Sequence, residues 1–142
     1  MLALLSIKPV HTENIFSGRK TFEYRRKVFA RSDVRTVLVY CTKPVGKLVG
    51  EFDIDEILQD SPSRLWKQTR TGAGISEIYF YEYFAGCEFG YALRIGNVRR
   101  FKRYIEPQKL VAEFSPPQSF MYIEESRLNS IGARTGASRC RN

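Results

Sequence analysis

The first third of the chain alternates short β-rich runs with a short amphipathic stretch. Residues 2–7 are almost wholly apolar and predict a first strand. Pro9 stands where a helix can begin, and Gly18 stands where a left-handed residue can end it, so we expect a helix between them. Residues 35–41 form a continuous β-rich run, which predicts a strand buried on both faces.

The next run, residues 48–57, alternates between apolar and polar positions. This pattern predicts a half-exposed strand, with Phe52 and Ile54 on the core face and Glu51 and Asp53 in solvent. We therefore expect Glu51 to be a solvated carboxylate.

Residues 61–86 change to helix-like apolar spacing and predict a helical insert between strands. Ser76 is a suitable N-cap for its second helix, and Gly86 is suited to end it. The β pattern then returns over residues 89–101, with a bulge expected at Gly96, and residues 119–123 predict a final strand.

Five to seven strands with two or three short helices indicate an α+β fold. A small mixed β-barrel suits this order better than a doubly wound sheet. We expect one domain over residues 1–125. The segment 126–142 has only Leu128 and Ile131 as large apolar residues, so we expect a basic, mobile tail there.

The net charge of the chain indicates which classes of binding partner are favoured. Twenty-three basic residues against fifteen acidic ones give a formal net charge of +8, which favours polyanions such as RNA, DNA or acidic membrane surfaces. The cations are concentrated in three runs: five in residues 19–27, four in residues 99–103, and the segment after Glu125, which has no acidic residue. Clustered cations in so small a domain favour a nucleic-acid partner over an evenly solvated surface.

The sequence lacks the features expected of metalloproteins, secreted proteins and membrane proteins. Cys41, Cys87 and Cys140 are far apart, and the single His11 has no neighbouring ligand, so we expect no metal site and no cofactor. The N-terminal apolar run is too short for a signal peptide, and no later segment is apolar enough to span a bilayer. We therefore expect a cytoplasmic protein with reduced cysteines and no membrane partner.

The cationic run at residues 18–27 is the best candidate site. In an extended strand, Glu23, Arg25 and Lys27 share one face, while Phe22 and Tyr24 share the other. The aromatic face predicts core, and the charged face predicts a binding site.

The spacing Gly18-x-Lys20-x-x-Glu23-x-Arg25, placed after a strand and a short helix, resembles the signature of the ASCH domain family of the PUA-like superfamily. Residues 49–52, 61–66 and 116–120 extend the resemblance, which covers about residues 2–124 and is closest in kind to stand-alone prokaryotic and viral members. The resemblance implies a PUA-like β-barrel whose cleft carries the signature residues, and a role in RNA recognition.

We expect this cationic cleft to bind RNA or a nucleotide, in transcription- or translation-linked regulation. Lys20 and Arg25 are suited to neutralise phosphates, whereas Glu23 either pairs with Arg25 or accepts a hydrogen bond from the exocyclic amine of a base. The predicted ligand-binding residues are Lys8, Lys20, Glu23, Arg25, Arg26, Ser119 and Tyr122. The predicted peripheral contacts to the nucleic-acid backbone are Arg99, Arg100, Lys102 and Arg103.

Two enzymatic alternatives stay open beside this binding module. Ribonuclease activity has been attributed to ASCH members, and candidates here by residue type are Lys8, Lys20, Tyr40, Ser119 and Tyr122. Small ASCH amidohydrolases that act on N4-acetylcytidine carry a threonine nucleophile where Glu23 stands, which counts against that chemistry, although Thr21 is near.

A third alternative is a protein-interaction domain of a transcriptional regulator. Its contact would be Tyr81 and Tyr83 of the aromatic helix, or the tail. We expect His11 to be a surface or capping residue, and Trp66 to be a core anchor rather than a base-stacking residue.

Overall fold

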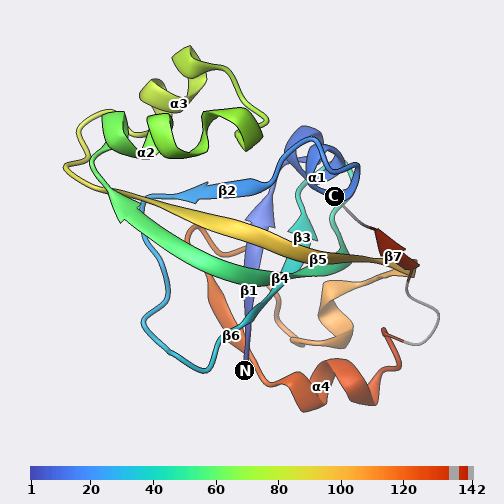
Figure 1. The fold of residues 1–142 in the computed structure, drawn as a ribbon. Helices are drawn as coiled ribbons and strands as arrows, with labels where there is room; N and C mark the ends of the chain where they lie inside the picture. The colour runs from blue at the N-terminus through green and yellow to red at the C-terminus, as the bar shows by residue number, and fades with distance from the viewer. Residues whose placement is uncertain (135–137, 141–142) are drawn as a thin grey trace.

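The computed structural model describes residues 1–134 and 138–140, and the order of its elements is drawn in Figure 1. The strands are β1 (Leu2–Ile7), β2 (Phe22–Arg25), β3 (Thr36–Cys41), β4 (Lys47–Asp60), β5 (Gly90–Ile105), β6 (Met121–Ile123) and β7 (Ser138–Cys140). The helices are α1 (Pro9–Phe16), α2 (Pro62–Thr69), α3 (Glu77–Tyr83) and α4 (Glu125–Ser130), with short 3₁₀ turns η1 (Arg70–Gly72) and η2 (Pro107–Lys109).

The strands form one mixed sheet in the order β2-β5-β4-β3-β1-β6, and β7 pairs with β5. Only the β1–β3 pair is parallel among the described pairings. The predicted α+β class is confirmed. The sheet is open rather than closed into a barrel, since none of the pairings in the described part of the chain joins β2 to β6.

The sheet separates two apolar clusters, because successive residues of a strand point to opposite faces. Leu5 of β1 and Val39 of β3 pack with Phe16 of α1 on one face. Leu4 packs on the other face with Leu128 of α4, which is fully buried. Both terminal helices are therefore fixed to the sheet by apolar contacts.

The predicted helical insert between β4 and β5 is confirmed as α2, η1 and α3, which lie together at one end of the two long strands (Figure 1). Ser76 caps α3 as expected, since its hydroxyl accepts a hydrogen bond from the Tyr79 amide at 3.1 Å. Trp66 packs against Phe80, with ring centroids 4.9 Å apart, so the prediction of a core anchor is confirmed.

The solvent-facing position predicted for Glu51 is wrong. Glu51 is completely buried, because the face of β4 that it shares with Asp53 is covered by Arg99 and Arg134 instead of water. An alternating pattern predicts which residues share a face of a strand, but not whether other parts of the chain cover that face.

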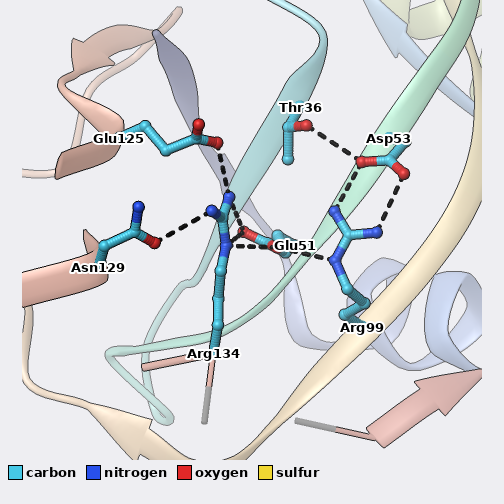
Figure 2. A network of polar contacts seen from close by, with 7 residues as sticks. All are labelled: Thr36, Glu51, Asp53, Arg99, Glu125, Asn129 and Arg134. Carbon is cyan, nitrogen blue, oxygen red and sulfur yellow. Dashed lines mark hydrogen bonds and ion pairs between the residues drawn. The ribbon is translucent and has the colours of Figure 1, made fainter. Parts of the chain in front are cut away.

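Two arginines compensate the charge of this buried carboxylate (Figure 2). The Nε atom of Arg99 donates to Glu51 Oε1 at 2.7 Å, and its terminal nitrogens also bond both oxygens of Asp53. The Nε atom of Arg134 donates to the same Glu51 oxygen at 2.9 Å. The hydrogen bond from Arg99 lowers the pKa of Asp53, so it favours the ionised form of that carboxyl group.

Part of the segment expected to be a basic, mobile tail is ordered against the domain. Residues 125–130 form α4, and Arg134 bonds Glu125 and Asn129 as well as Glu51. The domain boundary at residue 125, and motion of the segment beyond it, remain predictions.

Candidate functional site

A pocket of about 410 Å³ lies where the end of β1, β2, α1, α3 and the chain before β6 meet. This volume is within the range of small-molecule sites, roughly 300–1,000 Å³. Its polar lining comprises Ser6, Lys8, His11, Lys20, Glu23, Arg25, Arg26, Lys27, Gln118 and Ser119. The pocket therefore gathers residues from both ends of the chain around the cationic strand.

The charged face of β2 lines this pocket instead of facing open water. Gly18, with φ of 85°, ends α1 and turns the chain toward β2, which pairs antiparallel with β5. Glu23 and Arg25 are only 7% and 8% exposed. The prediction that they share one face is consistent with their common place in the pocket, where other elements cover that face.

Arg25 is held by two elements at once. Its Nε atom lies 3.2 Å from Glu23 Oε2 without the alignment of a hydrogen bond, and its NH2 group donates to the Ser6 carbonyl at 2.8 Å. The guanidinium is therefore positioned by the end of β1 as well as by its neighbour on β2. Apart from this ion pair, Glu23 has no side-chain hydrogen bond within residues 1–134.

Lys20 lies at the base of the pocket and is 1% exposed. Its Nζ atom donates to the Ala73 carbonyl at 2.8 Å and lies 4.8 Å from the ring centroid of Tyr24. Burial lowers the pKa of Lys20, and the charge of Glu23 acts in the opposite direction. In the part of the chain that the structure describes, no carboxylate lies within 4.0 Å of this ammonium, so its charge is poorly compensated.

His11 and Tyr79 form a contact between α1 and α3 at the pocket. The His11 Nε2 and Tyr79 Oη atoms are 3.5 Å apart, and the two rings meet edge to face with centroids 5.6 Å apart. The His11 Nδ1 atom is buried without a hydrogen-bond partner, and burial lowers the pKa of the imidazole. His11 was expected at the surface or in a cap, and its place near Lys8 was the one signal in the sequence for a pocket position.

The structure brings most of the predicted ligand residues into one pocket. Six of the seven line it, namely Lys8, Lys20, Glu23, Arg25, Arg26 and Ser119. Tyr122 does not, and its ring packs against Phe120 with the Arg31 guanidinium 5.5 Å from its centroid. Their role in binding remains a prediction. The lining residues that the sequence did not suggest include His11, Tyr79 and Gln118.

The four predicted peripheral cations differ in their surroundings. Arg99 is engaged by Glu51 and Asp53, and Arg100 pairs with Glu13 while lying over the Phe16 ring. Lys102 and Arg103 are exposed. Backbone contacts by any of the four remain a prediction, and the two exposed side chains are the better placed for them.

Besides Tyr122, two residues considered for catalysis lie outside the pocket lining. Tyr40 is buried beside Phe114 in the cluster that contains Leu128. The Thr21 hydroxyl donates weakly to the Gly72 carbonyl at 3.4 Å. Neither residue is therefore placed to act on a ligand in this pocket.

The described residues contain neither a cluster of metal ligands nor a membrane-spanning helix. No group of three or more His, Cys, Asp or Glu side chains there could hold a metal ion. Within the same residues, every helix is too short or too polar to cross a membrane.

Comparisons with known proteins show which protein family has these features. Residues 5–117 match the family model described as the ASCH domain. An "ASCH domain-containing ribonuclease" of Zymomonas mobilis is 27% identical over 135 residues, which cover 94% of this chain and 91% of that protein. A crystal structure of ASCH from the same organism has a TM-score of 0.85 at 27% identity, covering 92% of this chain and 93% of that one. A tyrosine-to-phenylalanine mutant of the Zymomonas protein has a TM-score of 0.84 at 26% identity, covering 92% and 96%.

Proposed function

The chain belongs to the ASCH domain family, and from that premise we propose that it binds single-stranded RNA, with one nucleotide in the pocket between β1, β2, α1 and α3. The ribonuclease name of the Zymomonas relative supports a function connected with nucleic acid. The pocket volume of about 410 Å³ suits a single nucleotide rather than a base-paired segment.

The observation that carries this proposal is the buried ammonium of Lys20. A buried charge is costly unless a partner compensates it, and among the described residues this ammonium has one neutral carbonyl as its hydrogen-bond partner and no carboxylate within 4.0 Å. A phosphate in the pocket would supply the missing negative charge. The buried cation is therefore better explained as part of a ligand site than as a contribution to the stability of the fold.

The remaining lining supports an anionic ligand. It contains five Lys or Arg side chains and the single carboxylate of Glu23. The Arg25 fork is held in place before a ligand arrives, which lowers the entropic cost of binding a phosphate. Arg26 and Lys27 are exposed and suited to the phosphates on either side.

Fluorescence anisotropy with a labelled single-stranded RNA, titrated over a range of salt concentrations, tests the proposal. Each phosphate contact contributes about 0.7 to the slope of log affinity against log salt for single strands. We expect Lys20→Met to lower the affinity at least tenfold and to reduce the slope by about 0.7, the contribution of one contact. Lys67→Met, which removes an exposed lysine of α2 outside the pocket, is the matched control.

The same titration separates the possible polyanions. Single-stranded DNA of the same sequence shows whether the 2′-hydroxyl contributes, and heparin shows whether any polyanion suffices. No RNA affinity at low salt, or equal effects of the Lys20 and Lys67 substitutions, would show that the pocket does not bind RNA.

RNA cleavage in the same pocket is a second candidate function. Burial lowers the pKa of Lys20, so more of its amine is neutral and able to accept a proton than in an ordinary lysine. In this reaction Lys20 takes the proton of a 2′-hydroxyl, and that oxygen attacks the adjacent phosphorus. The 5′-oxygen then leaves with a proton from the Lys8 ammonium, which gives a cyclic 2′,3′-phosphate and a free 5′-hydroxyl.

A labelled RNA and a copy with one 2′-deoxy residue test this candidate. We expect cleavage at every accessible linkage except the one after the deoxy residue, and none with Lys20→Met. Intact RNA at high protein concentration, across a range of pH and with divalent cations added, would leave binding as the function.

A further inference from the structure

We propose that the ring of Tyr79 is the stacking surface for the base of the bound nucleotide, with His11 as the residue that positions it. This inference rests on the proposed function and adds the part of the pocket that distinguishes a nucleotide from a simple anion. The cations at the bottom of the pocket account for the binding of a phosphate. The nucleobase must then be bound by another part of the pocket.

Three tyrosines line the pocket, and the surroundings of two of them exclude a base. Tyr24 is 5% exposed, with Lys20 over its ring and Phe80 at its edge, 5.0 Å between centroids. Tyr83 has the Arg26 guanidinium 4.4 Å from its centroid and packs against Phe84. Each ring already has its neighbours within the protein.

Tyr79 differs from both because its side chain is accessible. The residue is 37% exposed although it lines the pocket, and its ring is near the edge of His11 on one side. The Nζ atom of Lys8 lies 6.0 Å from the centroid, at the outer limit of a cation–π contact, and leaves room beside the ring. This is the aromatic surface that a base can reach.

The Tyr79 ring is held by contacts from two helices. Its own amide is capped by the Ser76 side chain, so the first turn of α3 is fixed. The Tyr79 hydroxyl meets His11 Nε2 of α1, so the ring direction is tied to the opposite side of the pocket. A stacking surface positioned before binding loses little side-chain entropy when a base stacks on it.

The charges that face His11 favour an uncharged imidazole. Burial lowers the pKa of the imidazole most, the charges of Lys20, Lys8 and Arg25 act in the same direction, and the charge of Glu23 opposes them. A neutral ring adds no charge to the wall on which the base would stack. It also keeps a lone pair on one nitrogen, so that the Tyr79 hydroxyl can donate to it.

Calorimetric titration with a nucleoside 5′-monophosphate and with ribose 5-phosphate tests this inference, because the two ligands differ only by the base. Stacking on an aromatic side chain is worth enough for the wild-type protein to prefer the nucleotide by about 5- to 150-fold. We expect Tyr79→Leu to abolish this preference while keeping the affinity for ribose 5-phosphate. Tyr79→Phe keeps the ring but loses the contact of its hydroxyl with His11, so it should retain only part of the preference.

Tyr81→Leu is the matched control, since Tyr81 is a similarly exposed tyrosine of α3 that does not line the pocket. A second measurement uses the monophosphate of 2-aminopurine riboside, whose emission is quenched by stacking. We expect quenching by the wild type, Tyr79→Phe and Tyr81→Leu, and little quenching by Tyr79→Leu.

The outcomes separate the two proposals. Failure of both ligands to bind the wild type would overturn the ligand site itself. If both ligands bind tightly and Tyr79→Leu leaves the preference for the nucleobase unchanged, only the proposal that Tyr79 is the stacking surface would be overturned. A change in oligomeric state caused by Tyr79→Leu, with the base preference intact, would also overturn it and assign this part of α3 to a protein contact.

Discussion

Arg134 and Glu51 lie 83 residues apart in the chain, yet the guanidinium of the first bonds both carboxylate oxygens of the second (Figure 2). Glu51 is fully buried on β4, whereas the Arg134 side chain is 31% exposed. The contact joins the chain after α4 to the middle of the sheet. It makes a segment near the C-terminus part of the charge balance of the core.

Removal of Arg134 should therefore destabilise the whole domain. In Arg134→Met, Glu51 retains Arg99 as a partner, so we expect the free energy of unfolding to fall by about 1–3 kcal/mol, less than for a fully orphaned buried charge. Urea unfolding measures the change. Arg64→Met, at an exposed arginine of α2, should change stability by less than about 0.5 kcal/mol.

A double substitution checks the assignment to this ion pair. If the two side chains act on each other, the loss in Glu51→Gln with Arg134→Met will be smaller than the sum of the single losses. Additive losses would mean that Arg134 stabilises the domain through other contacts.

Lys20→Met should stabilise the fold. Replacing a buried charge by an apolar side chain of similar shape is expected to raise the free energy of unfolding by about 1–4 kcal/mol near neutral pH. The pKa of Lys20 is lowered below its ordinary value of 10.5, so the unfolded chain binds more protons there than the folded one. The stability of the wild type therefore rises with pH between the lowered value and 10.5, and the advantage of Lys20→Met shrinks.

Urea unfolding of wild type, Lys20→Met and Lys67→Met at several pH values between 6 and about 10 measures this dependence. A difference between wild type and Lys20→Met that stays constant over this range would contradict the lowered pKa. Weaker RNA binding together with a more stable fold would identify Lys20 as a residue kept for function.

Two glycines with positive φ give a matched test of the base of the pocket. A Cβ atom at Gly74 would lie 2.6 Å from the Lys20 Cβ atom, whereas one at Gly86 would have no heavy atom within 4 Å. We expect Gly86→Ala to lose about 1–2 kcal/mol from backbone strain alone. Gly74→Ala should lose about 1–3 kcal/mol more, because Lys20 must move.

Of these two substitutions, only Gly74→Ala, which displaces Lys20, should alter binding. We expect Gly74→Ala to weaken RNA binding and Gly86→Ala to leave it unchanged in the anisotropy assay. Equal losses of stability at the two glycines would show that Lys20 yields to the added methyl group without strain.

Glu23→Gln tests whether the carboxylate serves mainly to hold Arg25. The Ser6 carbonyl also holds Arg25, so the guanidinium should stay in place without the charge of Glu23. The loss of one negative charge beside the pocket should then raise the affinity for ribose 5-phosphate about two- to tenfold at low salt. Glu82→Gln, on the exposed side of α3, is the control.

The opposite result would assign Glu23 a direct role. A weaker affinity for nucleotides with an unchanged affinity for ribose 5-phosphate would mean that the carboxylate accepts a hydrogen bond from the base. A loss for both ligands would mean that Arg25 depends on Glu23 after all.

The sequence predicted those elements whose signals are local. The strand before Pro9, the helix ended by Gly18 and the Ser76 cap all depend on residues a few positions apart, and each is confirmed. The gathering of Lys20, Glu23 and Arg25 followed from the signature spacing.

The errors involve partners that are distant in the chain. Glu51 was assigned to solvent because nothing near it in sequence indicates that Arg99 and Arg134 cover this face of β4. The pairing of His11 with Tyr79 spans 68 residues, and no periodicity predicts it. Tertiary contacts of this kind override local pattern, and a single sequence does not contain them in readable form.

The insert between β4 and β5 has a consequence for how the pocket can change. The cationic residues at the bottom of the pocket come from the sheet and from the loop before β2. Tyr79 and Tyr83 come from a helix inserted at the end of two paired strands (Figure 1). If the protein binds a nucleotide as proposed, affinity for the phosphate and preference for the nucleobase are encoded in separate stretches of the gene. An altered or transplanted α3 would give this protein a new ligand preference while the phosphate site is inherited intact.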